Sequence, residues 1–152
     1  MAVIKIVQNP IDTYEALYNV CNYITRPDKT ENGRYVGARG MDTNKAYEEI
    51  VEMQAIFNKT DGRKGYHMIV SFSEGSPLSA DDIFQIANEI SYIFFPTYQV
   101  VFGLNMVEGH PHIHFFINIV SLYDGKKLHI GFSELKLLRS LINQIESNFL
   151  EF

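Results

Sequence analysis

Hydrophobic and polar residues follow one another along this chain in two patterns, one typical of strands and one typical of helices. Residues 2–7 alternate, and β-branched and aromatic residues dominate three later runs, which predicts strands at 2–7, 66–72, 98–106 and 112–120. Elsewhere apolar residues recur every three or four positions, which predicts helices after Asp12, over 44–57, from Ser79 to about 94 and after Ser133. Weaker patterns at 34–38 and 126–130 indicate two further short strands.

The turn between the two longest apolar runs determines how they pair. Glu108 and Gly109 leave only a short connection between 98–106 and 112–120, and strands joined in this way pair antiparallel. We therefore expect an α+β domain with a mainly antiparallel central sheet and helices packed on it. The helix starts are predicted from capping residues, which are Asp12 with Glu15, Thr43, Ser79 with Asp82, and Ser133.

Composition and charge add general limits to this picture. The chain has 152 residues, which suits a single domain over 1–152, and its one cysteine, Cys21, fits a reducing compartment such as the cytoplasm. No apolar run approaches the roughly 20 residues of a membrane span, and the N-terminus is too short and wrongly flanked for a signal peptide. The formal net charge of −5 argues against general coating of nucleic acid, although not against a local basic groove.

The strongest chemical signal is a cluster of histidines at 110–114, which holds three of the five in the chain. Side chains two positions apart share one face of a strand and lie roughly 6.6 Å from each other, so His112 and His114 can converge on one ion. Pro111 cannot donate to a sheet, so the strand should begin after it. We therefore predict His112 and His114 as a metal-binding pair and His110 as a third candidate. The alternative is a solvated histidine cluster on a sheet face.

Oxygen donors near this pair extend the candidate metal site. Glu108 lies just across the tight turn, and Asn105 lies close by in the preceding strand. Imidazole and oxygen ligands together suit Mg, Mn or Zn rather than metals that select thiolates. A Lewis acid held in this way suits hydrolysis or phosphoryl transfer. The sequence contains neither a Gly-rich phosphate loop nor a nucleophile elbow that would indicate another class of site.

Three segments together resemble the relaxase/mobilisation nuclease family, the DNA-nicking enzymes of conjugative and mobilisable elements within the His-hydrophobic-His endonuclease superfamily. NYITRPDKT at 22–30 is similar to the family's nucleophile motif, YHMIVSF at 66–72 to its first central strand, and HPHIHFFIN at 110–118 to its metal strand. The resemblance covers roughly 3–145 and implies a relaxase or rolling-circle nickase-like fold.

The resemblance also implies a reaction and a nucleophile. In this family a tyrosine hydroxyl attacks the scissile phosphate of single-stranded DNA at an origin of transfer and forms a 5′-phosphotyrosyl link, assisted by a divalent metal that histidines hold. The nucleophile implied here is Tyr23. A phenol with a pKa near 10 needs positive charge nearby to react at neutral pH. Tyr14 and Tyr18, earlier in the same predicted helix, are rivals that better suit structural or DNA-contacting roles.

Four further residues are candidates for the site, although a basic residue taken alone is more often solvated surface. His67 is either a catalytic group that orients the nucleophile or a phosphate, or a histidine satisfied on a covered face of the sheet. Arg26, Lys29 and Arg34 are expected to line a DNA-binding groove. Relaxosome accessory proteins and a coupling protein would be the protein partners, and the chain would be either a stand-alone minimal enzyme or the N-terminal domain of a longer one.

Two positions depart from the family's metal motif. The motif usually begins with a histidine seven residues before the His-x-His pair, and an aspartate follows two residues after that first histidine. Asn105 and Val107 occupy these two positions here. The chain is therefore a nickase with a modified metal site, or a related domain that binds DNA without cutting it. A third alternative is a metal hydrolase of another class, in which His112 and His114 activate water.

Overall fold

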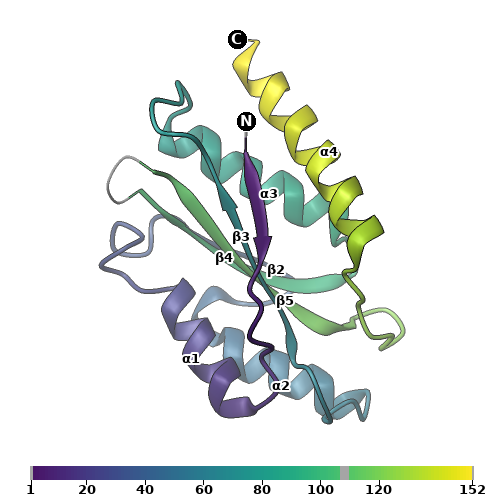
Figure 1. The fold of residues 1–152 in the computed structure, drawn as a ribbon. Coiled ribbons are helices and arrows are strands. Elements are labelled where there is room, and N and C mark those ends of the chain that lie inside the picture. The colour runs from purple at the N-terminus through teal and green to yellow at the C-terminus, as the bar shows by residue number, and fades with distance from the viewer. Residues whose placement is uncertain (1, 107–109, 152) are drawn as a thin grey trace.

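The structure, a computed structural model that describes residues 2–106 and 110–151, is a sheet covered by helices on both faces (Figure 1). Its strands are β1 Val3–Ile6, β2 Val36–Arg39, β3 Gly65–Ser71, β4 Tyr98–Asn105 and β5 His112–Ser121. Its helices are α1 Tyr14–Ile24, α2 Ala46–Ile56, α3 Ala80–Phe94 and α4 Phe132–Leu150, and a 3-10 turn, η1 Thr43–Lys45, leads into α2.

The strands form one sheet in the order β1-β3-β5-β4-β2, and each neighbouring pair is antiparallel. The expected α+β fold with an antiparallel sheet is therefore confirmed. β5 lies in the centre, between β3 and β4, and it begins at His112, directly after Pro111 as predicted. The two histidines of the predicted pair consequently stand at the start of the central strand, where residues of both neighbouring strands lie beside them.

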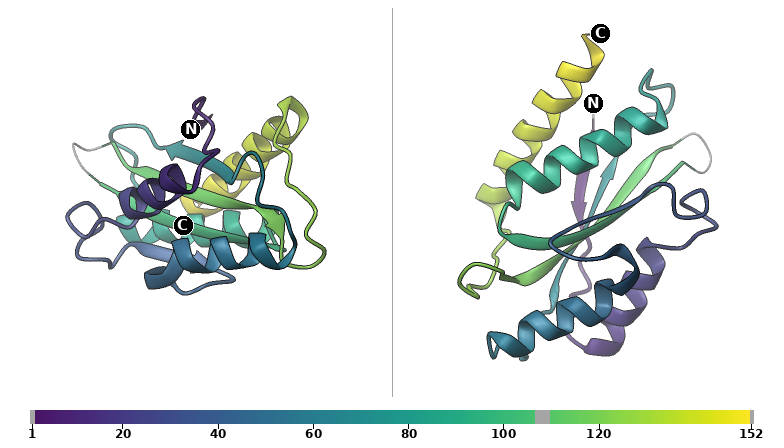
Figure 2. Two further views of the ribbon diagram at one scale, coloured as in Figure 1. Left: turned by 90° about the horizontal axis from the view of Figure 1, so that it is seen from below. Right: turned by 180° about the vertical axis from the view of Figure 1, so that it is seen from behind.

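Helices lie on both faces of the sheet (Figures 1 and 2), and each face has its own hydrophobic core. Helices α1 and α2 pack on one face through a small core that includes Leu17, Val20, Ile50, Val101 and Phe116. Helices α3 and α4 cover the other face with a larger core that contains alternate residues of β5, among them Ile113, Phe115 and Ile117. Because successive side chains of a strand point to opposite faces, His112 and His114 share the α1/α2 face with Phe116.

Four local predictions are wrong in detail. The N-cap of α1 is Thr13, whose hydroxyl accepts from the Ala16 N–H, and not Asp12. Asp42 caps η1 in place of Thr43, and α4 begins after Gly131, whose N–H donates to Glu134, two residues before Ser133. The segment 126–130 makes one isolated bridge, between Val120 and Lys127, rather than a strand. The Ser79–Asp82 capping box of α3 is confirmed.

A buried polar network joins α2 to the sheet. Asn118, fully buried in β5, donates to Gln99 Oε1 at 2.8 Å and accepts from Gln54 Nε2 at 3.0 Å and from the Val120 N–H at 3.2 Å. Gln54 is also fully buried and accepts from the Tyr14 hydroxyl, which links the network to α1. A buried amide with three partners fixes how these elements meet, because its bonds can form in only one arrangement.

Replacing Asn118 with leucine should destabilise the fold strongly. The change would leave polar groups of Gln99, Gln54 and Val120 buried without this partner, and we expect the free energy of unfolding to fall by about 2–4 kcal/mol. Denaturant unfolding measures the loss. Asn148→Leu, at an exposed position of α4, serves as the control and should change stability by no more than about 0.5 kcal/mol.

Candidate active site

The end of α1 lies directly on the sheet because β4 has a glycine beneath it. A Cβ atom built on Gly103 would stand 2.2 Å from the carbonyl oxygen of Ile24, closer than any real side chain allows. Gly103 is the register partner of His114 in β5. The missing side chain therefore lets the last turn of α1, which carries Tyr23, approach His114.

Tyr23, His67 and His114 come together at this point. The Tyr23 ring stands edge-on to His114, with centroids 5.3 Å apart at 81°, and its centroid is 6.3 Å from that of His67. His67 Nε2 and His114 Nδ1 are 3.1 Å apart, a hydrogen bond between the two imidazoles. The predicted nucleophile thus lies against the predicted metal strand, and His67 contacts a histidine of the candidate site rather than only filling the face of the sheet.

Arg26 supplies positive charge next to Tyr23. Its guanidinium carbon lies 4.5 Å from the centre of the Tyr23 ring, a cation–π arrangement. Its Nε is buried and has no hydrogen-bond partner among the described residues. Thr30, itself buried, donates its hydroxyl to the Arg26 carbonyl and so fixes the turn that follows α1. A charged N–H that has no acceptor among the described residues, beside an exposed phenol, is suited to donate to an anionic oxygen.

The metal-ligand candidates are only partly assembled. His112 stands opposite Asn105 of β4 and opposite Ser71 of β3, so Asn105 is beside the histidine pair as predicted. His110 lies outside β5, and its Nε2 is 3.4 Å from Glu74 Oε2, so it is not drawn to the pair. Glu108 and Val107 lie outside the described residues. Within 2–106 and 110–151, no group of three or more His, Cys, Asp or Glu side chains is arranged to hold a metal ion.

The other predicted residues lie in different surroundings. Arg34 forms an ion pair with Asp81 of α3 at 3.5 Å, and the Tyr35 hydroxyl donates to the same carboxylate. This contact lies beside β2, at the edge of the sheet. Lys29 lies in the turn after Arg26, where its N–H donates to the Arg26 carbonyl. Tyr14 has the structural role expected of it, because its hydroxyl donates to buried Gln54.

Burial keeps both histidines of the bonded pair neutral. Removal from water lowers the pKa of His114 to about 4, with further lowering by His67, His112 and Arg26. Removal from water lowers the pKa of His67 as well. A neutral imidazole keeps a lone pair free, so at neutral pH these groups are available as ligands or hydrogen-bond acceptors.

The lowered pKa of His114 predicts how stability depends on pH in the metal-free protein. The unfolded chain binds a proton near pH 6.5, whereas the folded chain resists it until about pH 4, so stability is full above 6.5 and falls as the pH drops. Between pH 7 and 5, we expect the free energy of unfolding to fall by about 1–2 kcal/mol from this group. Urea unfolding with chelator present measures it, and an unchanged slope in His114→Asn would contradict the assignment.

Two residues of this site were missed by the sequence analysis. Gly103 matters because it has no side chain, which lets the end of α1 approach β4, and Thr30 matters because its hydroxyl donates to the Arg26 carbonyl. A glycine inside the apolar run that forms β4 was the available signal, since such glycines often mark close backbone approach. Thr30 gave no comparable signal, because a threonine in a polar loop does not show which backbone carbonyl its hydroxyl will bind. In the structure that carbonyl belongs to Arg26.

A tyrosine at a helix end, a guanidinium stacked on it and the neutral histidines His67 and His114 on two neighbouring strands form a site suited to phosphate chemistry. The chain matches the family model of the MobA/VirD2-like relaxase nuclease domain over residues 23–149, and it belongs to this relaxase family. The match begins at Tyr23. Comparison with curated proteins finds no match.

A solved structure described as the molecular basis of vancomycin resistance transfer in Staphylococcus aureus has a similar fold. It superposes with a TM-score of 0.69 at 9% sequence identity, covering 99% of this chain and 93% of that chain. The likeness therefore concerns the whole fold rather than the sequence. None of the helices within 2–106 and 110–151 combines the length and the apolar character of a membrane-spanning segment.

Proposed function

We propose that the chain nicks one strand of DNA at an origin of transfer and forms a covalent link through Tyr23. The contact of the Tyr23 ring with His114, beneath the Arg26 guanidinium, is the observation that carries the proposal. The Tyr23 oxygen would bond to phosphorus while the bond from phosphorus to the 3′ oxygen breaks. The phenol proton passes through solvent to the departing 3′ oxygen, which leaves a 5′-phosphotyrosyl link and a free 3′-OH.

Arg26 is proposed to bind the scissile phosphate. Its buried, unpartnered Nε can donate to a phosphate oxygen, and its charge lowers the energy of the phenolate as the hydroxyl reacts. His114, with a pKa of about 4, is a weak base at neutral pH, but its neutral ring keeps a lone pair available to bind a metal ion. We therefore assign the histidines to ligand binding rather than to removal of the phenol proton.

A divalent metal, Mg or Mn first and Zn second, is proposed as the cofactor. When bound, it would polarise the phosphate as a Lewis acid. His112 and His114 would hold it together with the Asn105 amide oxygen, and their mixed nitrogen and oxygen chemistry fits these metals. If the Nδ1–H of His114 donates to His67 Nε2, the Nε2 atom of His114 keeps its lone pair free for the metal. His67 would then orient the His114 ring as a metal ligand.

The proposed function is tested by a denaturing gel of the protein with labelled single-stranded oligonucleotides from the transfer origin of its own element. We expect a slowly migrating covalent band with Mn that chelator removes. Clear binding in a native gel without such a band would favour the second candidate, a relaxase-related domain that binds origin DNA without cutting it. That candidate is favoured by Asn105, which stands opposite His112 where the family's metal motif usually has a histidine.

Asn105→His should strengthen metal binding. The new imidazole would stand opposite His112 and provide a third nitrogen ligand, so we expect Mn affinity to rise by at least about tenfold. Isothermal titration with Mn measures this affinity. Asn105→Leu, which has no donor atom, is the matched control and should bind more weakly than the natural protein. Equal affinity in all three proteins would exclude position 105 from the metal site.

A further inference from the structure

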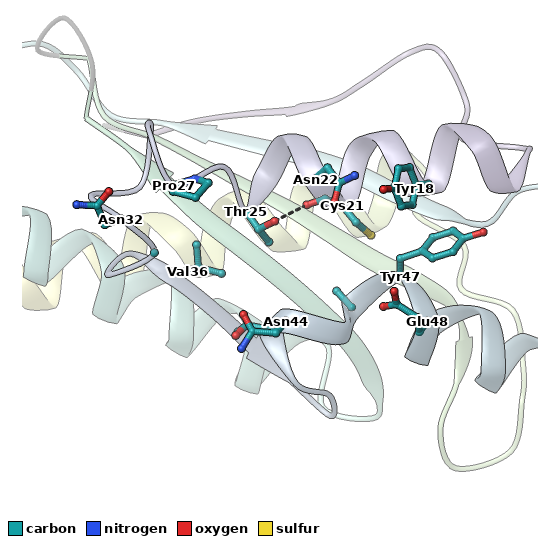
Figure 3. A pocket seen from close by; sticks show the side chains of 13 residues that line it. Tyr18, Cys21, Asn22, Thr25, Pro27, Asn32, Val36, Asn44, Tyr47 and Glu48 are labelled. Carbon is teal, nitrogen blue, oxygen red and sulfur yellow. Dashed lines mark hydrogen bonds between the residues drawn. The ribbon is translucent and has the colours of Figure 1, made fainter.

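A half-open cavity of about 440 Å³ lies on the other flank of the helix that carries Tyr23 (Figure 3). One wall is formed by Asn22 and Thr25 of the α1 end, and the opposite wall by Asn44 of η1 and Glu48 of α2. Asn22 directly precedes Tyr23, so the cavity adjoins the candidate active site. None of the roles proposed above uses this cavity.

The charge of the cavity walls shows which part of a nucleic acid suits it. Among the described residues that line it, none is lysine or arginine, and Glu48 is the one charged side chain. A phosphate would meet a carboxylate there without a compensating cation, which is unfavourable. The amide and hydroxyl groups of Asn22, Asn44 and Thr25 instead suit a neutral ring with donors and acceptors on its edge.

Two tyrosines form one end of the cavity. Tyr18 of α1 and Tyr47 of α2 meet edge to face, with ring centroids 5.2 Å apart, and both line the cavity. Half of the Tyr18 surface is exposed, at 50%, although the residue belongs to the helix that covers the sheet. Exposed aromatic rings beside polar groups are the usual platform on which proteins receive single-stranded bases.

We propose that this cavity receives a nucleobase with an exocyclic amino group, from a nucleotide that flanks the scissile phosphate. The proposal rests on the proposed DNA-nicking function. The Glu48 carboxylate accepts from the amino group, as acidic side chains accept from cytosine N4, and the Asn44 amide one turn earlier donates to the neighbouring ring acceptor. Thymine is disfavoured because its edge has a carbonyl oxygen on each side of its one donor.

Binding to short homopolymers tests this specificity apart from cutting. The Tyr23→Phe protein, which keeps the ring and lacks the nucleophile, is titrated with fluorescein-labelled 12-mers of dC and of dT at one salt concentration. Both bases are pyrimidines, so the comparison isolates the edge of the ring. We expect the dC 12-mer to bind at least about fivefold more tightly than the dT 12-mer.

Glu48→Gln in the same background should reduce that ratio to below about twofold, since an amide both donates and accepts. Glu52→Gln is the matched control, because it removes the same charge one turn further along α2, outside the cavity, and it should keep the ratio. Equal affinity for dC and dT, or a ratio that Glu48→Gln leaves unchanged, would overturn the base pocket and leave the nicking function standing. Failure to bind either 12-mer would overturn both.

Discussion

Tyr23→Phe is expected to abolish the covalent DNA adduct while leaving the fold intact. The substitution removes only the hydroxyl that would bond to phosphorus, and the ring keeps its contacts with His114 and Arg26. Loss of a nucleophile without replacement should lower the rate of adduct formation by at least about a thousandfold. Because 44% of the Tyr23 surface is exposed, the free energy of unfolding should change by no more than about 0.5 kcal/mol.

Tyr18→Phe is the control for this experiment, because Tyr18 is a rival nucleophile on the same helix and is similarly exposed. It should form the adduct at close to the natural rate. The measurement is the time course of the covalent band on a denaturing gel, with thermal unfolding of each variant alongside. An adduct that survives in Tyr23→Phe and disappears in Tyr18→Phe would move the nucleophile to Tyr18.

Gly103→Ala is expected to impair nicking although no reactive group is changed. The new Cβ would stand 2.2 Å from the Ile24 carbonyl and 3.3 Å from Thr30 Cγ2, so the end of α1 must move away from β4. Overpacking of this kind costs about 1–3 kcal/mol of stability. Displacing Tyr23 from His114 by about 1 Å should lower the rate of adduct formation about a hundredfold.

Gly75→Ala is the matched control, because Gly75 has a φ of +82° and open space where a Cβ would be added. Backbone strain should destabilise this variant by about 1 kcal/mol without moving α1. Both variants should therefore unfold at lower temperature, and only Gly103→Ala should lose adduct formation when assayed well below either midpoint. Full activity in Gly103→Ala would show that the close approach of α1 to β4 is not needed for the reaction.

The residue types of the candidate site were readable from the chain because they fall in short local patterns. His112 and His114 are two positions apart in an apolar run, which predicts their shared face, and Tyr23 and Arg26 are one helical turn apart. The interactions that join these patterns were not readable. The bond between His67 and His114 depends on the register of β3 with β5, which a local pattern does not specify.

The wrong cap assignments arose where two neighbouring residues had equal local preferences for the cap position. Asp12 and Thr13 are both good caps, and the helix begins after Thr13, which lies where its hydroxyl reaches the Ala16 N–H. The DNA-binding role of Arg34 stays a prediction, and its ion pair with the exposed Asp81 depends on where α3 packs beside β2. His110 was a third ligand candidate by spacing, and its contact with Glu74 comes from the loop after β3.

The sequence by itself determined the α+β class, the order of its main strands and helices, and the residue types that are proposed to carry the chemistry. These follow from hydrophobic periodicity and turn residues, which act over a few positions. Only the tertiary structure decided that the end of α1 packs directly on Gly103, that Arg26 stacks on Tyr23 and that a polar cavity adjoins the site. Such arrangements depend on contacts between segments far apart in the chain, and these form only when the sheet and both cores pack together.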